Sequence, residues 1–215
     1  MTSAYDATRY LYETPEALVG LDEATPETMR SAFEDDVGHI LEQYNAGTDV
    51  VAIQGSVSSM KTWLLTCTAE TFLSRSQRVA VLVPQRINRR DIVERLEFVG
   101  VPYVERPGRK DLCVWEPWQD MVGRVDERIC SSNGCPMYPS NRDLEQLAKK
   151  ALQIYYLEIG GQIGLNQQTA KLLADKLPQP VCPHYLLNAL TKLVDSEKMV
   201  RIATYAKAFK ATDAN

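Results

Sequence analysis

Residues 49–65 read DVVAIQGSVSSMKTWLL and give the clearest indication of the fold class. The short apolar run at the start is typical of a buried parallel strand. A loop of small residues follows, and the apolar residues after it begin a helical pattern that runs to about Ser74. Strand, small-residue loop, Lys-Thr and helix is the arrangement of a phosphate-binding loop. The stretch therefore predicts an α/β domain that binds a nucleotide.

The chemistry of such a loop assigns roles to two residues. Backbone N–H groups in the loop and at the helix N-terminus point toward an anion. Lys61 is expected to reach the β- and γ-phosphates of ATP, and Thr62 to offer its hydroxyl to Mg²⁺. Met60 departs from the pattern, because a P-loop has glycine there and a β-carbon resists the backbone angles of a tight loop. The alternative is a plain strand-to-helix turn with a surface lysine.

Alternating helical and strand patterns surround this loop. A helix is expected from Thr25, which can cap it, to about Gly47, whereas residues 1–24 are polar and irregular. Residues 78–84 and 101–104 are apolar runs typical of strands, with a helical pattern between them. This order predicts a parallel sheet flanked by helices, in which ligands bind at the carboxyl ends of the strands.

Four of the five cysteines follow the last of these strands, with the spacing C-x16-C-x4-C-x46-C. They are Cys113, Cys130, Cys135 and Cys182, whereas Cys67 lies in the helix after the phosphate loop. A single cysteine is most often a core residue, but three of these four adjoin proline, glycine or charged residues. Thiolates gathered in fours form disulfides, zinc sites or iron–sulfur clusters.

The N-terminus has neither the basic start nor the apolar core of a signal peptide, and no stretch is apolar enough to span a membrane. A cytoplasmic location without a membrane partner is therefore expected, where structural disulfides are rare. Zinc sites favour tight pairs such as C-x2-C, and the middle pair here is C-x4-C. Widely spaced thiolates suit a cluster equally well, so spacing alone leaves zinc and iron–sulfur open.

Between the cysteines the α/β alternation stops. Residues 143–159 and 167–177 have helical patterns there. After Cys182, residues 186–194 have a further helical pattern, and residues 200–206 are typical of a strand that returns to the sheet. With 215 residues, 45% of them apolar, the chain fits one large domain with a helical insertion. The net charge of −4 excludes a protein that is basic overall, but a local basic track can still bind phosphate backbones. The candidates are Arg86, Arg89, Arg90, Arg109 and Lys110.

Together these features resemble the iron–sulfur superfamily 2 DNA helicases of the XPD and DinG type. The matching motifs are the Lys61-Thr62 loop, the strand and basic loop that follow it, RKDLC at 109–113, CPHY at 182–185 and the closing strand. The resemblance covers residues 25–210. It implies a RecA-like P-loop domain whose insertion holds a [4Fe–4S] cluster and helps form a passage for single-stranded DNA, with ATP hydrolysis driving 5′-to-3′ movement.

The resemblance also assigns residues. It implies that the four cysteines from Cys113 to Cys182 ligate the cluster and that Arg86, Arg89, Arg109 and Lys110 contact DNA. The nucleotide would be bound by Gly55, Ser58, Ser59, Lys61 and Thr62. The expected domain organisation is an irregular segment over 1–24, a RecA-like portion over 25–112, the cluster insertion over 113–182 and a return to the sheet over 183–215.

Two elements of the family are not found in the sequence. The family has an Asp-Glu-x-His box after the insertion, whereas the similar Asp22-Glu23 pair lies before the phosphate loop. A second RecA-like domain would have to be supplied in cis or in trans. We therefore expect no catalytic residue in this chain and no productive ATP hydrolysis by it alone. The alternative function is a non-enzymatic four-cysteine module, with zinc or iron–sulfur, that binds nucleic acid or protein and has a degenerate P-loop.

Overall fold

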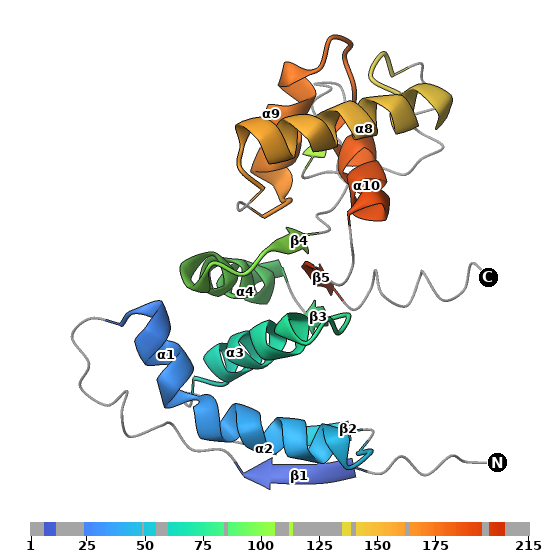
Figure 1. Ribbon diagram of the computed structural model, residues 1–215. Coiled ribbons are helices and arrows are strands. Elements are labelled where there is room, and N and C mark those ends of the chain that lie inside the picture. The colour runs from blue at the N-terminus through green and yellow to red at the C-terminus, as the bar shows by residue number, and fades with distance from the viewer. Residues whose placement is uncertain are drawn as a thin grey trace, which may run out of the picture. The chain divides into compact units, whose positions relative to one another are not determined.

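The computed structural model describes residues 7–11, 24–48, 50–54, 60–83, 86–105, 112–113, 135–138, 141–161, 164–194 and 198–204. The chain is a mixed α/β protein and divides into two compact units, residues 1–77 and 78–215 (Figure 1). The first unit contains β1 (Ala7–Leu11), α1 (Pro26–Ala32), α2 (Glu34–Asn45), β2 (Val50–Gln54) and α3 (Lys61–Ser74). The second contains β3 (Ala80–Val83), α4 (Arg86–Val99), β4 (Tyr103–Glu105), α8 (Asn141–Glu158), α9 (Gln167–Lys176), α10 (Pro183–Leu193) and β5 (Val200–Thr204).

The sheet of the first unit has two described strands. β2 forms where the apolar run predicted it and pairs in parallel with β1, with Ala7 opposite Val50 and Leu11 opposite Gln54. β1 lies in the segment that the sequence analysis predicted to be irregular. Its backbone groups find their partners in β2, far along the chain, and strand pairing of this kind depends on tertiary context more than on local propensity.

Two helices precede β2, where one was predicted. α1 begins as expected at Pro26, and the Thr25 hydroxyl accepts a hydrogen bond from Thr28 N–H at 3.2 Å. Phe33, fully buried with φ −104° and ψ 5°, interrupts the helical backbone before α2 begins with three acidic residues in its first turn. Such residues are favourable at the positive end of the helix dipole. The core of this unit consists of Met29, Phe33, Val37, Ile40, Leu41, Leu64 and Cys67.

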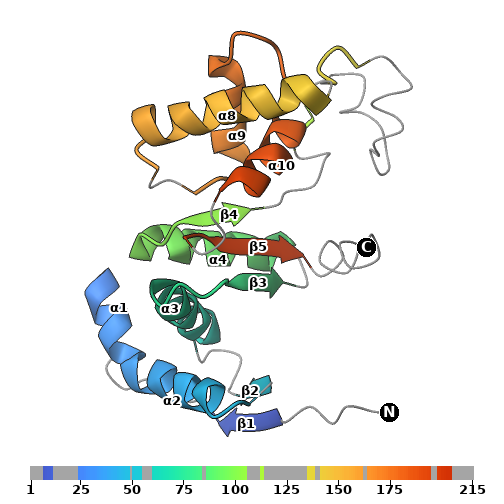
Figure 2. The same ribbon diagram turned by 45° about the vertical axis from the view of Figure 1, so that its right-hand side comes forward.

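The sheet of the second unit is entirely parallel, with the order β3-β5-β4 (Figure 2). Residues 200–204 do return to the sheet as predicted, and they form its central strand, with Val81 opposite Ile202 and Val104 opposite Arg201. α4 follows β3 and packs against all three strands. The described strands thus form two sheets, whereas the sequence analysis predicted one.

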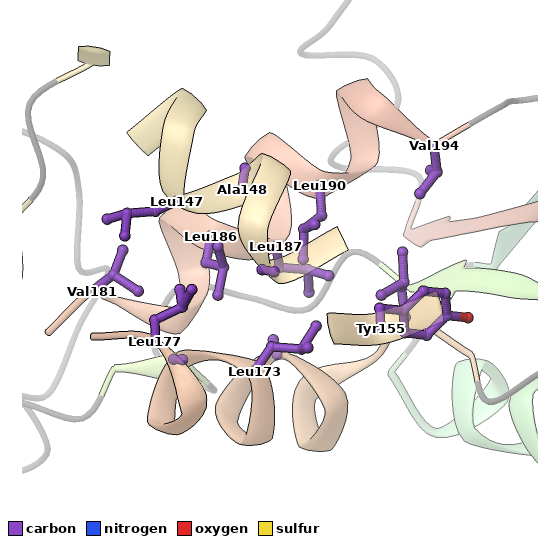
Figure 3. Packing of buried hydrophobic residues seen from close by; sticks show 14 of the residues in the cluster. Leu147, Ala148, Tyr155, Leu173, Leu177, Val181, Leu186, Leu187, Leu190 and Val194 are labelled. Carbon is purple, nitrogen blue, oxygen red and sulfur yellow. The ribbon is translucent and has the colours of Figure 1, made fainter. Parts of the chain in front are cut away.

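Three helices of the second unit, α8, α9 and α10, are here defined as the helical module. The sequence predicted the first two between the cysteines and the third after Cys182. Their bounds agree with the predicted patterns to within about three residues. α10 packs against both other helices, and Leu186, Leu187 and Leu190 project from it into their shared interior (Figure 3). Leu173 of α9 and Tyr155 of α8 are also fully buried in this core.

The helical module is attached to the sheet by the connection between α8 and α9. Leu165 N–H donates to the Tyr103 carbonyl at 2.9 Å, and Glu105 N–H donates to the Leu165 carbonyl at 2.8 Å. These bonds form a parallel bridge on the outer side of β4. The bridge satisfies backbone groups at a sheet edge that would otherwise need water or another strand.

Candidate nucleotide and metal sites

The phosphate-loop candidate lies between β2 and α3. Lys61 and Thr62 are the first two residues of α3, as predicted, and Gly55, Ser58 and Ser59 lie outside the described residues. α3 has 14 residues, so its N-terminus carries the partial positive charge of a well-formed helix. A strand, and after it a helix that opens on Lys-Thr, are two parts of the layout of a phosphate-binding loop.

Met60 has the backbone conformation of a glycine. Its φ of 56° and ψ of 25° are left-handed, and its side chain is 39% exposed. The carbonyl of Met60 then accepts hydrogen bonds from Trp63 N–H at 2.8 Å and Leu64 N–H at 3.3 Å, which starts the helix. A non-glycine residue in this region costs about 1–2 kcal/mol. The chain therefore keeps the local geometry for which a P-loop uses glycine, with a methionine in its place.

Two of the predicted metal ligands belong to copies of the same tetrapeptide pattern, Cys-Pro-x-Tyr, at 135–138 and 182–185. The copies lie side by side, because Cys182 N–H donates to the Met137 carbonyl at 3.1 Å. The rings of Tyr138 and Tyr185 meet edge to face, with centroids 5.2 Å apart and an interplanar angle of 84°. The resemblance to the helicases involves the second copy, and the first copy repeats its pattern 47 residues earlier in the sequence.

Each copy is held by a backbone turn that starts at its cysteine. Tyr138 N–H donates to the Cys135 carbonyl at 3.0 Å. Cys182 precedes α10, with Pro183 in the first turn, and its carbonyl accepts from Leu186 N–H at 3.0 Å. Proline at this position fits because the first turn of a helix has no partner for that N–H.

The third described ligand candidate, Cys113, adjoins the same core. Leu112 is fully buried in the hydrophobic cluster of the helical module, as is Val181, which precedes Cys182. The segments of Cys113, Cys135 and Cys182 are therefore all anchored to the helical module, whereas Cys130 lies outside the described residues. Cys113 and Cys135 are half-buried and Cys182 is buried.

The donor chemistry of these segments suits a metal centre, because thiolates bind both zinc and iron–sulfur clusters. Within the described ranges, however, no three His, Cys, Asp or Glu side chains are grouped so as to hold a metal ion. The backbone contacts thus bring two ligand segments together, while the sulfur atoms themselves form no described metal site.

Cys67 has a different environment from these cysteines. It is buried on α3 among the apolar residues of the first unit, as its helical context predicted. Burial raises the pKa of its thiol to about 11, and the nearby Glu70 carboxylate acts in the same direction. The thiol is therefore neutral at physiological pH and has the properties of a core residue.

Of the four residues predicted to contact DNA, Arg89 is the one whose side chain the structure describes. Arg89 is only 9% exposed, and its Nε lies 2.5 Å from the Glu105 carboxylate at the end of β4. An arginine in this position neutralises a buried carboxylate and is not available on the surface as the prediction required. The Arg86 side chain, Arg109 and Lys110 lie outside the description. Sequence spacing could not reveal this ion pair, because Arg89 lies on α4 and Glu105 lies on the next element, β4.

Comparison of the chain with models of known protein families, with curated proteins and with solved structures finds no match. Among the described helices, none has the length and apolar character needed to cross a membrane.

Proposed function

We propose that the chain is the N-terminal part of an iron–sulfur DNA helicase, with a partial RecA-like domain that binds ATP and single-stranded DNA. The observation that carries the proposal is the hydrogen bond from Cys182 N–H to the Met137 carbonyl. It joins the two Cys-Pro-x-Tyr turns with a distance of 3.1 Å between nitrogen and oxygen. Ligands from distant parts of a sequence must be brought to one place before they can share a cluster. The burial of Leu112 beside this core supports Cys113 as a further ligand.

Cys113, Cys130, Cys135 and Cys182 would hold a [4Fe–4S] cluster, which in this class of protein shapes the passage for single-stranded DNA. The helical module would contribute the scaffold of that site, because its three helices share one hydrophobic core. Arg86, Arg109 and Lys110 remain the proposed contacts to the DNA backbone.

The nucleotide site would use the N-terminus of α3. Lys61 would bind the β- and γ-phosphates, Thr62 would ligate Mg²⁺, and Gly55, Ser58 and Ser59 would complete the loop. The left-handed backbone at Met60 supports this part of the proposal, because it is the conformation that the glycine of a P-loop supplies.

The test is the metal content of anaerobically purified protein, measured as iron, acid-labile sulfide and zinc. About four irons and four sulfides per chain, with absorbance near 400 nm, are expected for a [4Fe–4S] cluster. Cys182→Ser and Cys135→Ser should each lower the iron content. Cys67→Ser is the matched control and should leave the iron content unchanged, since that thiol lies in the core of the first unit. Equal iron loss in all three variants would contradict the assignment.

A second candidate is a non-enzymatic four-cysteine module with zinc or iron–sulfur and a degenerate P-loop. The exposed methionine at position 60 favours it, because a side chain there can occupy the space of the phosphates. Zinc in place of iron and sulfide, together with no ATP binding by Met60→Gly, would support this candidate over the helicase.

A further inference from the structure

A groove runs between α2 and α3 in the first unit, separate from the nucleotide and metal candidates. It has a volume of about 580 Å³. On α2 it is lined by Glu34, Val37, Gly38 and Leu41, which follow the spacing i, i+3, i+4, i+7 of a single helix face. Figures 1 and 2 both show α2 and α3 as neighbouring helices.

The opposite wall repeats this spacing. On α3 the groove is lined by Cys67, Glu70, Thr71 and Ser74, again at i, i+3, i+4 and i+7. Two matching stripes on adjacent helices are the geometry into which a third helix packs. Each stripe spans eight residues, and the rise from the first to the last is roughly 10 Å, about two helical turns.

The floor of the groove is apolar. Val37, Leu41 and Cys67 are each less than 8% exposed, and Cys67 Sγ lies 4.0 Å from the Met29 carbonyl. The raised pKa of Cys67 keeps its thiol uncharged over the physiological range. Apolar floors of this kind bind apolar side chains, because the contact removes both surfaces from water.

Gly38 lines the groove. It lies in the middle of α2, where glycine costs about 1 kcal/mol relative to alanine. No heavy atom lies within 4 Å of the position that a β-carbon would take, so internal packing does not demand glycine there. Glycine in a helix face lets another backbone approach closely.

The charges that line the groove favour a basic partner. Arg30 Nε donates to both carboxylate oxygens of Glu70 at 3.0 Å, and its Nη1 lies 3.5 Å from Glu27. One guanidinium is thus shared by two carboxylates, and the groove also contains Glu34. The charged side chains that line the groove are Arg30, Glu34 and Glu70, with a net charge of −1. A cationic side chain on an incoming helix would be attracted to the carboxylates of the groove.

We propose that the α2–α3 groove docks an amphipathic helix of a partner protein. The helix presents small and apolar residues to Gly38 and the groove floor, and lysine or arginine to the carboxylates of Glu34 and Glu70. The proposal is independent of the helicase function, since it uses neither the phosphate loop nor the four predicted ligands.

The test uses a fluorescein-labelled peptide of about 16 residues, roughly 24 Å long as a helix, with alanine and leucine on one face and lysines in its last turn. Fluorescence anisotropy with the full chain should show saturable binding. A matched peptide with glutamates in place of the lysines should bind at least about tenfold more weakly.

Three variants of the chain complete the design. Gly38→Trp fills the groove and should weaken binding of the basic peptide by at least about tenfold. Leu65→Trp is the matched control, because Leu65 is exposed on α3 away from the groove stripe, and it should leave binding unchanged. Glu34→Lys should weaken the basic peptide and strengthen the acidic one. Thermal unfolding of each variant confirms that it is folded.

The proposal is overturned if the folded full chain does not bind the basic peptide, or if Gly38→Trp and Leu65→Trp weaken binding equally. It is also overturned if the chain alone forms a dimer that Gly38→Trp abolishes, since the occupant would then be a second copy. Binding of small apolar solutes without any peptide binding would likewise contradict a helical partner.

Discussion

The ring of Tyr103 packs on Gly164 so closely that a β-carbon at position 164 would overlap Tyr103 Cζ. This contact joins the start of β4 to the connection between α8 and α9. The Tyr103 hydroxyl extends it, because it donates to the Glu97 carboxylate and accepts a hydrogen bond from Asn166 Nδ2 at 2.9 Å. This side-chain contact therefore adds to the backbone bridge at Leu165 in holding the helical module to the sheet.

Gly164→Ala should destabilise the second unit. The added methyl group overlaps a fully buried ring whose hydroxyl has two partners, so the ring cannot move without breaking hydrogen bonds. Overpacking of this kind costs about 3 kcal/mol, and thermal unfolding should show a lower midpoint. Gly38→Ala is the control and should raise stability by roughly 0.5–1 kcal/mol, because nothing lies near its added methyl group. Equal effects of the two substitutions would disprove the Tyr103 contact.

Met60→Gly should both stabilise the chain and strengthen ATP binding. The substitution removes left-handed strain of about 1–2 kcal/mol, partly offset by the greater backbone entropy of glycine. It also removes the side chain at the position where a P-loop approaches phosphates. Isothermal titration with ATP and Mg²⁺ should show tighter binding than in the wild type, and Lys61→Ala should abolish it.

Ser76→Gly separates the gain in stability expected for Met60→Gly from the gain in ATP affinity. Ser76 is the other described non-glycine residue with a positive φ, at 59°, and it follows α3 at its C-terminal end. Its replacement should raise the free energy of unfolding by a similar amount, about 1 kcal/mol, without changing ATP affinity. A gain in ATP affinity in both variants would attribute the effect to general stability and not to the phosphate loop.

Arg89→Met should reduce the free energy of unfolding and should have a smaller effect on the affinity for single-stranded DNA. The substitution leaves the Glu105 carboxylate buried without its guanidinium, a loss of about 3 kcal/mol for a buried pair. The double variant Arg89→Met/Glu105→Gln should recover much of that loss in urea unfolding, because the buried charge is gone. If Arg89→Met instead weakens single-stranded DNA binding with no change in stability, the original prediction of a DNA contact is correct.

The chain should lose stability as the pH rises above about 9. Burial raises the pKa of the Cys67 thiol from 9.0 to about 11 and that of the Tyr155 hydroxyl from 10.0 to about 12. Above its ordinary pKa each group loses its proton more readily in the unfolded chain, so stability falls with pH through this window. The stabilising contribution of each group is fully present below its ordinary pKa and has been lost once the pH exceeds its raised pKa. Cys67→Ala should make the thermal midpoint less sensitive to pH between about 9 and 11.

The helices could be predicted from the sequence because their signals are local. Thr25 and Pro26 mark the start of α1, and the spacing of apolar residues in α8, α9 and α10 is visible over several turns. Phe33 shows the limit of such patterns, since it fits the helical spacing and yet interrupts the helix. The spacing of apolar residues predicts that the Phe33 ring is buried, but it does not predict whether the helix continues through Phe33.

Strand pairing could not be predicted in the same way. β1 has no apolar run, and its partner β2 lies beyond two helices. The burial of Arg89 has a similar origin, because its partner Glu105 lies on β4, and the two residues meet where α4 packs against that strand. Of the candidate metal site, the sequence identified the cysteines, while the contact between the two Cys-Pro-x-Tyr turns depends on the packing of α10.

The strand order of the second unit has a consequence for how the protein is made. β3 and β4 never pair with each other, because β5 lies between them, and Val104 finds its partner only at Arg201. At about 5–20 residues per second, translation delivers that partner roughly 5–20 s after β4. During this interval both strands have left the ribosome without their central partner, and long-range pairing of this kind is slow. The cysteines and helices between β4 and β5 are therefore synthesised before the sheet can close.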